Sequence, residues 1–191
     1  EVWDSTASQL GPLEIRVAKI VQSHPTSVFG HYLLAQLYLR LFSENPSELM
    51  LLKQASDLAQ QAVELGPTVE FGYVALANVL DFMGHGDKGI EVLTSGQSRG
   101  MKVSWRTSFT TARLQAETAS ADQILALLKR SMEGCHKQVS IIAPYVVATL
   151  QTSLQGEAFD AELEDLNVSC PNHYFEVTLA DSFAKQKKYE A

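Results

Sequence analysis

The sequence predicts an all-α fold in which antiparallel helix pairs stack in a row. Apolar residues recur at the i, i+3, i+4, i+7 spacing of an amphipathic helix along most of the 191 residues. Proline and glycine separate these segments at short intervals, so the predicted helices are short. The pattern of one helix pair also recurs in its neighbour, which is typical of repeat proteins.

The clearest helix pair spans residues 67–101. Its two amphipathic segments face each other across the turn 84–87, and the small residues Gly89 and Gly96 let a neighbouring backbone approach the second segment. The apolar stripe of the first segment contains Tyr73, Leu76, Ala77 and Leu80, and that of the second contains Ile90 and Leu93. So short a pair cannot bury both stripes alone, and we expect similar units on each side of it.

Three helices precede this pair. They are expected over residues 11–24, about 27–42 and 48–65, and they end at Pro25, the turn 43–46 and Gly66-Pro67. Pro12 is expected to begin the first helix, and the residues through Gln9 are expected to fray. Ser47 is predicted to be the N-cap of the third helix.

The segments 26–67 and 68–101 share one pattern. When the first helices are aligned, the matching residues are His31, Leu34, Ala35 and Tyr38 in one segment and Tyr73, Leu76, Ala77 and Leu80 in the other. When the second helices are aligned backward from Pro67 and Met101, the matching residues are Ala55, Ala59 and Ala62 and Gly89, Leu93 and Gly96. The repeating unit is therefore 34 residues long, with eight extra residues around 43–53 in the first copy.

These residues resemble the tetratricopeptide repeat, in which an aromatic, Leu-Gly/Ala, Tyr and a turn Gly precede Ala, Phe, Ala and Pro. The unit 68–101 carries Tyr73, Leu76-Ala77, Leu80, Gly84, Gly89 and Leu93, and the unit 26–67 carries Leu34-Ala35, Tyr38, Ala55, Ala59, Ala62 and Pro67. His31 in the aromatic slot and the eight extra residues depart from the family pattern. The resemblance implies a right-handed α–α superhelix whose first helices line a concave groove.

The remaining helices are predicted mainly from periodicity, over residues 105–116, 120–134, 141–154, 157–168 and 172–185. Ser120 and Gln123 form a capping box, Pro144 begins or kinks its helix, and residues 185–190 resemble the family's inter-helix turn. The chain is thus interpreted as one solenoid, 1–191, with units 11–25 (partial), 26–67, 68–101, 102–136, 137–171 and 172–191 (partial). Because both ends cut across a repeat, we interpret it as a fragment of a longer array.

Charge and composition argue against several classes of partner. The net charge of −7 and pI near 5.2 disfavour nucleic acid, and so an RNA-binding helical repeat, because these surfaces need a basic stripe. No run of about 18 apolar residues predicts a membrane span. Residues 1–9 do not have the pattern of an intact signal peptide. A signal peptide cleaved before Glu1 stays an alternative, so the sequence does not predict the compartment.

The two cysteines, Cys135 and Cys170, fall at equivalent points of adjacent predicted units. Stacked units lie roughly 10 Å apart, whereas a disulfide requires Cα atoms within about 7 Å. The pattern therefore favours two free, partly buried thiols over a disulfide. It also lacks the CxxC or Cys/His spacing of a metal or redox site.

No catalytic, cofactor or metal site is predicted. The histidines lie mostly at helix ends and turns and lack HExxH spacing: His24, His31, His85, His136 and His173. There is no GxGxxG or P-loop, and the acidic residues of 160–165 alternate along a solvated helix face. We therefore expect a protein that is not an enzyme and that needs no cofactor.

The resemblance also indicates a set of groove residues. In the family, the side chain two residues before the aromatic slot faces the groove. The corresponding residues are Phe29, Phe71, Trp105, Ile141 and Tyr174, and further groove positions include Tyr32, Gln36, Val74 and Asn78. Asn78 matches an asparagine of chaperone-binding members, but only Arg40 accompanies it, so an acidic tail is not the expected ligand. The alternative is that each aromatic residue packs against the preceding helix and belongs to the core.

The function that the resemblance implies is a scaffold or adaptor that holds a mainly apolar peptide or partner helix in its groove. One alternative is a regulatory or substrate-presenting arm of an enzyme whose catalytic domain lies outside the chain. A second is self-association through the uncovered apolar stripe of the last helix.

Overall fold

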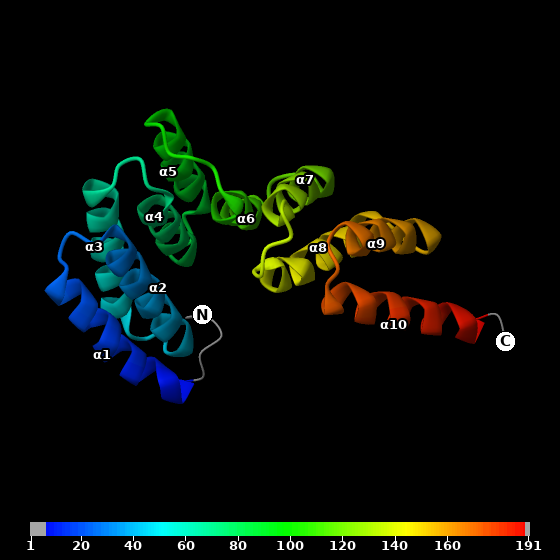
Figure 1. Ribbon diagram of the computed structural model, residues 1–191, viewed down its shortest axis with the longest axis horizontal. Coiled ribbons are helices and arrows are strands. Elements are labelled where there is room, and N and C mark those ends of the chain that lie inside the picture. The colour runs from blue at the N-terminus through cyan, green and yellow to red at the C-terminus, as the bar shows by residue number, and fades with distance from the viewer. Residues whose placement is uncertain (1–6, 190–191) are drawn as a thin grey trace. The chain divides into compact units, whose positions relative to one another are not determined.

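The computed structural model describes residues 7–189, and the side chains of residues 9–184. These residues form ten α-helices and no strand, which confirms the predicted all-α fold (Figure 1). The helices are α1 (Ala7–Ser23), α2 (Val28–Glu44), α3 (Leu49–Leu65), α4 (Glu70–Phe82), α5 (Gly86–Ser98), α6 (Trp105–Leu114), α7 (Ala121–Met132), α8 (Val139–Ser153), α9 (Glu157–Ser169) and α10 (His173–Tyr189). Within this part of the chain, no helix is long and apolar enough to cross a membrane.

The chain divides into two compact units, Glu1–Thr110 and Thr111–Ala191, which we call unit 1 and unit 2. Unit 1 contains α1 to α5 and the beginning of α6, whereas unit 2 contains the end of α6 and α7 to α10. In both units, short turns join consecutive helices, as expected for a helical repeat (Figure 1).

The core of unit 1 is formed where α2, α3 and α4 pack against one another. Ala55, Ala59 and Ala62 on α3 are fully buried, which confirms the predicted small face of this helix. Leu39 of α2 and Val79 of α4 pack in one cluster with Ala55 and Ala59. Because alanine side chains are short, the three helix axes can approach closely without leaving cavities.

The closest approach in unit 1 is between α3 and α4 at Gly72. A Cβ atom there would lie 2.5 Å from the backbone nitrogen of Val63 and 2.7 Å from the carbonyl carbon of Ala62. Only glycine fits at this position without moving one of the two helices. Next to it, the hydroxyl of the buried Tyr73 donates to the carbonyl oxygen of Pro67, at 2.8 Å.

Unit 2 has a smaller core. Helix α7 packs against α8, and α10 packs against both α8 and α9. Ile142 and Leu150 of α8, Leu163 of α9 and Phe175 of α10 are fully buried. Phe159, Leu163 and Leu166 all point inward, as their helical spacing predicted. The predicted capping box between Ser120 and Gln123 is also confirmed at the start of α7.

The N-terminal helix is longer than predicted. Helix α1 begins at Ala7, so Pro12 lies inside it rather than at its start, and the expectation of fraying is wrong for residues 7–9. Residues 1–6 lie outside the described residues. Leu10 explains the difference, because this buried side chain packs on Leu34 and Leu37 of α2 and so holds the first turns of α1.

Two other predicted helix ends were wrong. Helix α3 begins at Leu49 without a side-chain cap, because the Ser47 hydroxyl donates to Oδ1 of Asn45 at 2.7 Å and serves the preceding turn instead. Helix α10 continues to Tyr189 through the segment that resembled an inter-helix turn. No glycine or proline interrupts residues 173–189, and the lysines and glutamine near its end favour a helix.

The sequence pattern favoured two free cysteines, and this prediction was wrong. Cys135 and Cys170 form a disulfide, and their Cα atoms lie 5.4 Å apart. The expected spacing of roughly 10 Å applies to packed helix bodies, whereas Cys135 lies in the loop after α7 and Cys170 is the C-cap of α9. Chain segments that leave the helices are not restricted to the spacing of the helix axes.

Candidate interaction surface

Three aromatic side chains from α2 and α4 meet on unit 1. The ring centroids lie 5.1 Å apart for Phe29 and Phe71, 5.0 Å for Tyr32 and Phe71, and 5.9 Å for Phe29 and Tyr32. These distances are within the range of attractive aromatic pairs. Phe29 is 48% exposed and the other two rings are half-buried, so three of the predicted groove residues form a continuous surface.

Arg106 extends this surface onto α6. Its guanidinium carbon lies 5.2 Å from the ring centroid of Phe71 and 4.5 Å from that of Trp105. Both distances are within the range of a cation–π contact. We call Phe29, Tyr32, Phe71 and Trp105 the aromatic cluster. Its members lie on α2, α4 and α6.

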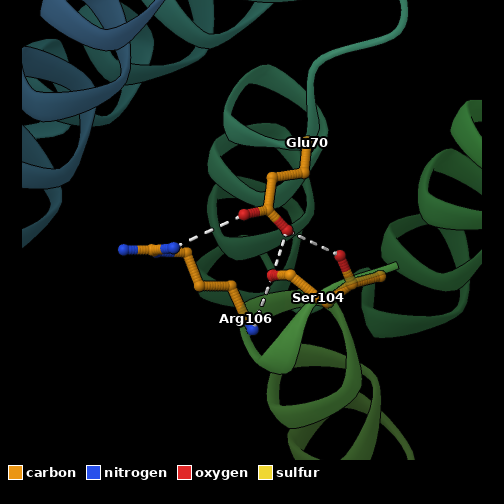
Figure 2. A network of polar contacts seen from close by, with 4 residues as sticks. Glu70, Ser104 and Arg106 are labelled. Atoms are coloured by element: carbon orange, nitrogen blue, oxygen red, sulfur yellow. Dashed lines mark hydrogen bonds and ion pairs between the residues drawn. The ribbon is translucent and has the colours of Figure 1, made fainter. Parts of the chain in front are cut away.

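Glu70 forms an ion pair with Arg106 (Figure 2). One carboxylate oxygen lies 3.4 Å from a terminal nitrogen of Arg106, and the other accepts hydrogen bonds from the hydroxyls of Ser104 and, at 3.1 Å, of Thr107. The Glu70 side chain is only 13% exposed, so it needs these donors to offset its loss of hydration. The network therefore joins the start of α4 to the start of α6.

The same network explains the weak repeat pattern of α6. Thr107, Ser108 and Thr110 are buried, although their side chains are polar. The Thr107 hydroxyl donates to Glu70, while the Ser104 hydroxyl also accepts the backbone N–H of Arg106, at 3.1 Å, and so caps the first turn. The Glu70 carboxylate therefore accounts for the hydroxyl side chains of Ser104 and Thr107.

Three of the predicted groove residues of unit 1 are not exposed. Gln36, Val74 and Asn78 are buried, at 4%, 3% and 8% exposure. The amide nitrogen of Asn78 lies 3.4 Å from the amide oxygen of Gln36, so the two side chains contact each other between α2 and α4. A partner can therefore reach the aromatic side chains on this part of unit 1, but not the amide groups of Gln36 and Asn78.

Unit 2 contains the other two predicted groove residues. Ile141 on α8 is 40% exposed and Tyr174 on α10 is 43% exposed. Tyr174 lines an open cavity of about 300 Å³ between α8 and α10, together with Gln151 and Asp181. Ile141 does not line this cavity.

The sequence pattern of the groove positions did not include the charged residues of the site, Glu70 and Arg106. A usable signal was present, because Glu70 directly precedes Phe71 and Arg106 directly follows Trp105. Opposite charges beside the groove aromatics of consecutive repeats are candidates for an ion pair between neighbouring first helices.

The alkaline limit of stability of unit 1 is expected to depend on Tyr32. Burial raises the pKa of its hydroxyl above the usual value near 10, and Arg106 beside it opposes this only in part. The stability that the protonated phenol supports is therefore fully present below about pH 10 and is lost as the pH rises through the raised pKa. Urea unfolding followed by Trp105 fluorescence should show this loss.

Tyr32→Phe should reduce that alkaline loss, because phenylalanine has no proton to release. Tyr174→Phe, at an exposed position of unit 2, is the control. An equal alkaline loss in the wild type and in Tyr32→Phe would contradict the assignment.

Comparison with solved structures identifies the fold. No protein-family model matches the chain, and no curated protein matches it either. The chain is similar to TTC0263, a thermophilic TPR protein of Thermus thermophilus, with a TM-score of 0.63 and 17% identity over 75% of this chain and 74% of that one. Two structures of MamA align with 12% and 15% identity over 96% of this chain and 92% and 88% of theirs, with a TM-score of 0.49 in each case.

The likeness to TTC0263 agrees with the paired helices and the buried repeat residues described above. At 17% identity it establishes the fold and nothing about partners. The chain is therefore an all-α helical-repeat protein with the fold of the tetratricopeptide repeat.

Proposed function

We propose that this chain is a protein-interaction scaffold, and that it binds a mainly apolar peptide or helix through the aromatic cluster of unit 1. The observation that carries the proposal is that the rings of Phe29, Tyr32 and Phe71 are in mutual contact and yet remain partly open to solvent. A cluster that served only the core would be closed, as the alanine cluster between α2, α3 and α4 is.

Energetic reasons favour this surface over others on the chain. Aromatic side chains bury a large apolar area at a small cost in conformational entropy, and they dominate the energy of many interfaces. Two helices of the cluster, α2 and α4, pack against each other in the core of unit 1, and the Glu70 network joins the start of α6 to α4. A surface on which rings predominate, and on which Glu70 and Arg106 pair with each other, suits a mainly apolar segment.

The proposal extends to unit 2 with less support. Tyr174 is half-exposed beside the cavity between α8 and α10, and Ile141 is exposed on α8. Val177 and Phe183 are exposed on α10 as well, so the last helix does present apolar side chains. Self-association through this helix stays a prediction, and sedimentation of the Phe183→Glu variant against the wild type tests it.

Selection of displayed peptides on the full chain tests the proposal. We expect selected peptides to be rich in apolar residues and to bind Phe29→Ala at least about tenfold more weakly, since losing an anchor side chain costs about 1–2 kcal/mol. Phe29 is suited to this test because its 48% exposure means that truncation removes little packing. Phe71→Ala should weaken binding further.

The matched control is Met50→Ala, which removes an apolar side chain that is 65% exposed on α3. It should bind the selected peptides like the wild type. Thermal unfolding of each variant, followed by circular dichroism, checks the fold. If Phe29→Ala and Met50→Ala bind equally well, the aromatic cluster is not the binding surface.

A further inference from the structure

We propose that the aromatic cluster accepts a cationic side chain, arginine or lysine, from the partner segment, and that Arg106 occupies this place in the free chain. The inference rests on the proposed function, because it names the chemistry that the partner brings to the same surface. It predicts a partner segment in which a basic residue lies among apolar ones.

The first support is the position of the Arg106 guanidinium. It lies over two rings of the cluster, 4.5 Å from the centroid of Trp105 and 5.2 Å from that of Phe71. The face of an aromatic ring carries partial negative charge and attracts a cation placed over it. The rings of α4 and α6 are therefore already arranged around a cation.

The second support is the Glu70 carboxylate. The hydroxyls of Ser104 and Thr107 donate to one of its oxygens, whereas Arg106 approaches the other at 3.4 Å, beyond the usual N–H···O hydrogen-bond range. Those hydroxyls hold the carboxylate in place without help from the guanidinium. If Arg106 leaves, the negative charge remains fixed beside the rings and can pair with another cation.

The third support is that the Arg106 side chain reaches solvent, so that it can leave the rings by giving up its contacts with Glu70 and the Tyr32 hydroxyl. Its side chain is 29% exposed, and its backbone belongs to the first turn of α6. The long side chain can turn toward water while its backbone hydrogen bond to Ser104 stays in place. The net charge of −7 further favours the approach of a basic segment over that of an acidic one.

The test compares peptides that differ in a single side chain. Three capped pentapeptides carry arginine, citrulline or glutamate between two pairs of leucines, and citrulline is the neutral isostere of arginine. Because the chain has two tryptophans, Trp3→Phe leaves Trp105 as the reporter, and its fluorescence follows binding directly. The full chain carries Trp3→Phe in every measurement.

The decisive variant is Arg106→Gln, which removes the resident cation and keeps an N–H donor for Glu70. We expect it to bind the arginine peptide about fivefold more tightly than the citrulline peptide, as a cation–π contact of about 1 kcal/mol gives. The wild type should show a smaller preference, because Arg106 competes for the rings. Glu70→Gln added to Arg106→Gln should remove most of the preference.

Arg106→Lys is the second variant, and it serves if Arg106→Gln fails to fold. Lysine retains the positive charge that pairs with Glu70. A lysine competes less well for the flat rings, so the preference for the arginine peptide should lie between those of the wild type and Arg106→Gln.

Each contrary result has a distinct meaning. Equal binding of the arginine and citrulline peptides by Arg106→Gln and Arg106→Lys overturns the cation site but leaves apolar docking standing. Tighter binding of the glutamate peptide by the wild type assigns Arg106 to a partner carboxylate and also overturns it. If no peptide changes Trp105 fluorescence, both the inference and docking on the aromatic cluster are contradicted.

Discussion

Reduction of the disulfide between Cys135 and Cys170 is expected to lower the free energy of unfolding of unit 2 by about 3 to 4 kcal/mol. The bond closes a loop across a sequence separation of 35 residues. In the chain-entropy description, a loop of this length restricts the unfolded chain by about that amount. This is a large fraction of the roughly 5–15 kcal/mol that typically separates folded from unfolded domains.

The packing of unit 2 leaves little to replace the bond. A cavity of about 400 Å³ lies between α7 and α9 beside the two cysteines, and the Met132 and Leu166 side chains line it. An ion pair between Lys129 and Glu162 joins the same two helices, but both side chains are partly exposed, so it contributes at most about 1 kcal/mol. Covalent linkage therefore supplies much of the attachment between α7 and α9.

Urea unfolding with and without dithiothreitol, followed by circular dichroism, measures this effect. The double variant Cys135→Ser, Cys170→Ser should resemble the reduced wild type and should not respond to the reductant. Trp105 fluorescence follows unit 1, which contains no cysteine, and should change little. Unfolding of unit 2 that is the same in oxidised and reduced protein would contradict a stabilising role for the bond.

Gly72→Ala is expected to destabilise unit 1 by about 3 kcal/mol, at the upper end of the cost of overpacking. The added methyl group would meet backbone atoms of Val63 and Ala62 at 2.5 to 2.9 Å. Backbone atoms inside a helix cannot turn away as a side chain can, so α3 and α4 would have to separate. Separation would loosen the alanine contacts of the whole cluster. The higher helix propensity of alanine offsets only about 1 kcal/mol of this.

The matched control is Gly84→Ala in the turn between α4 and α5. Gly84 has a φ of +75° and open space around its Cβ position. Its replacement should cost about 1 kcal/mol, because only backbone strain opposes it. Urea midpoints from Trp105 fluorescence compare the two variants. Equal costs would mean that helix contact at Gly72 is looser than the structure indicates.

Sequence patterns predicted the elements of this fold well where periodicity and punctuation agree. The units 26–67 and 68–101 carry regular apolar stripes, and glycine or proline bounds each of their helices, so the helices were found within a few residues. The errors fell where another contact, distant or local, competes with the expected helix-end signal. Leu10 extends α1 by packing on α2, and Ser47 serves a turn rather than a cap.

The candidate site was predicted only in part. The repeat register brought Phe29, Tyr32, Phe71 and Trp105 to the first helices of successive pairs, and all four lie around Arg106 or one another. The register did not distinguish exposed from buried positions, and Gln36, Val74 and Asn78 are interior. Burial depends on how closely neighbouring helices approach, and Gln36 and Asn78 contact each other where α2 packs against α4.

By itself, the sequence determined the helical class and the resemblance to a helical repeat, and it contains no recognisable catalytic or phosphate-binding motif. These properties follow from the spacing of side chains along the chain, which is visible without coordinates. Only the tertiary structure decided that two cysteines are bonded and that Glu70 pairs with Arg106 beside the rings. Both depend on distances between residues about 35 positions apart. The packing of the helices sets such distances, and the spacing of residues within one helix does not.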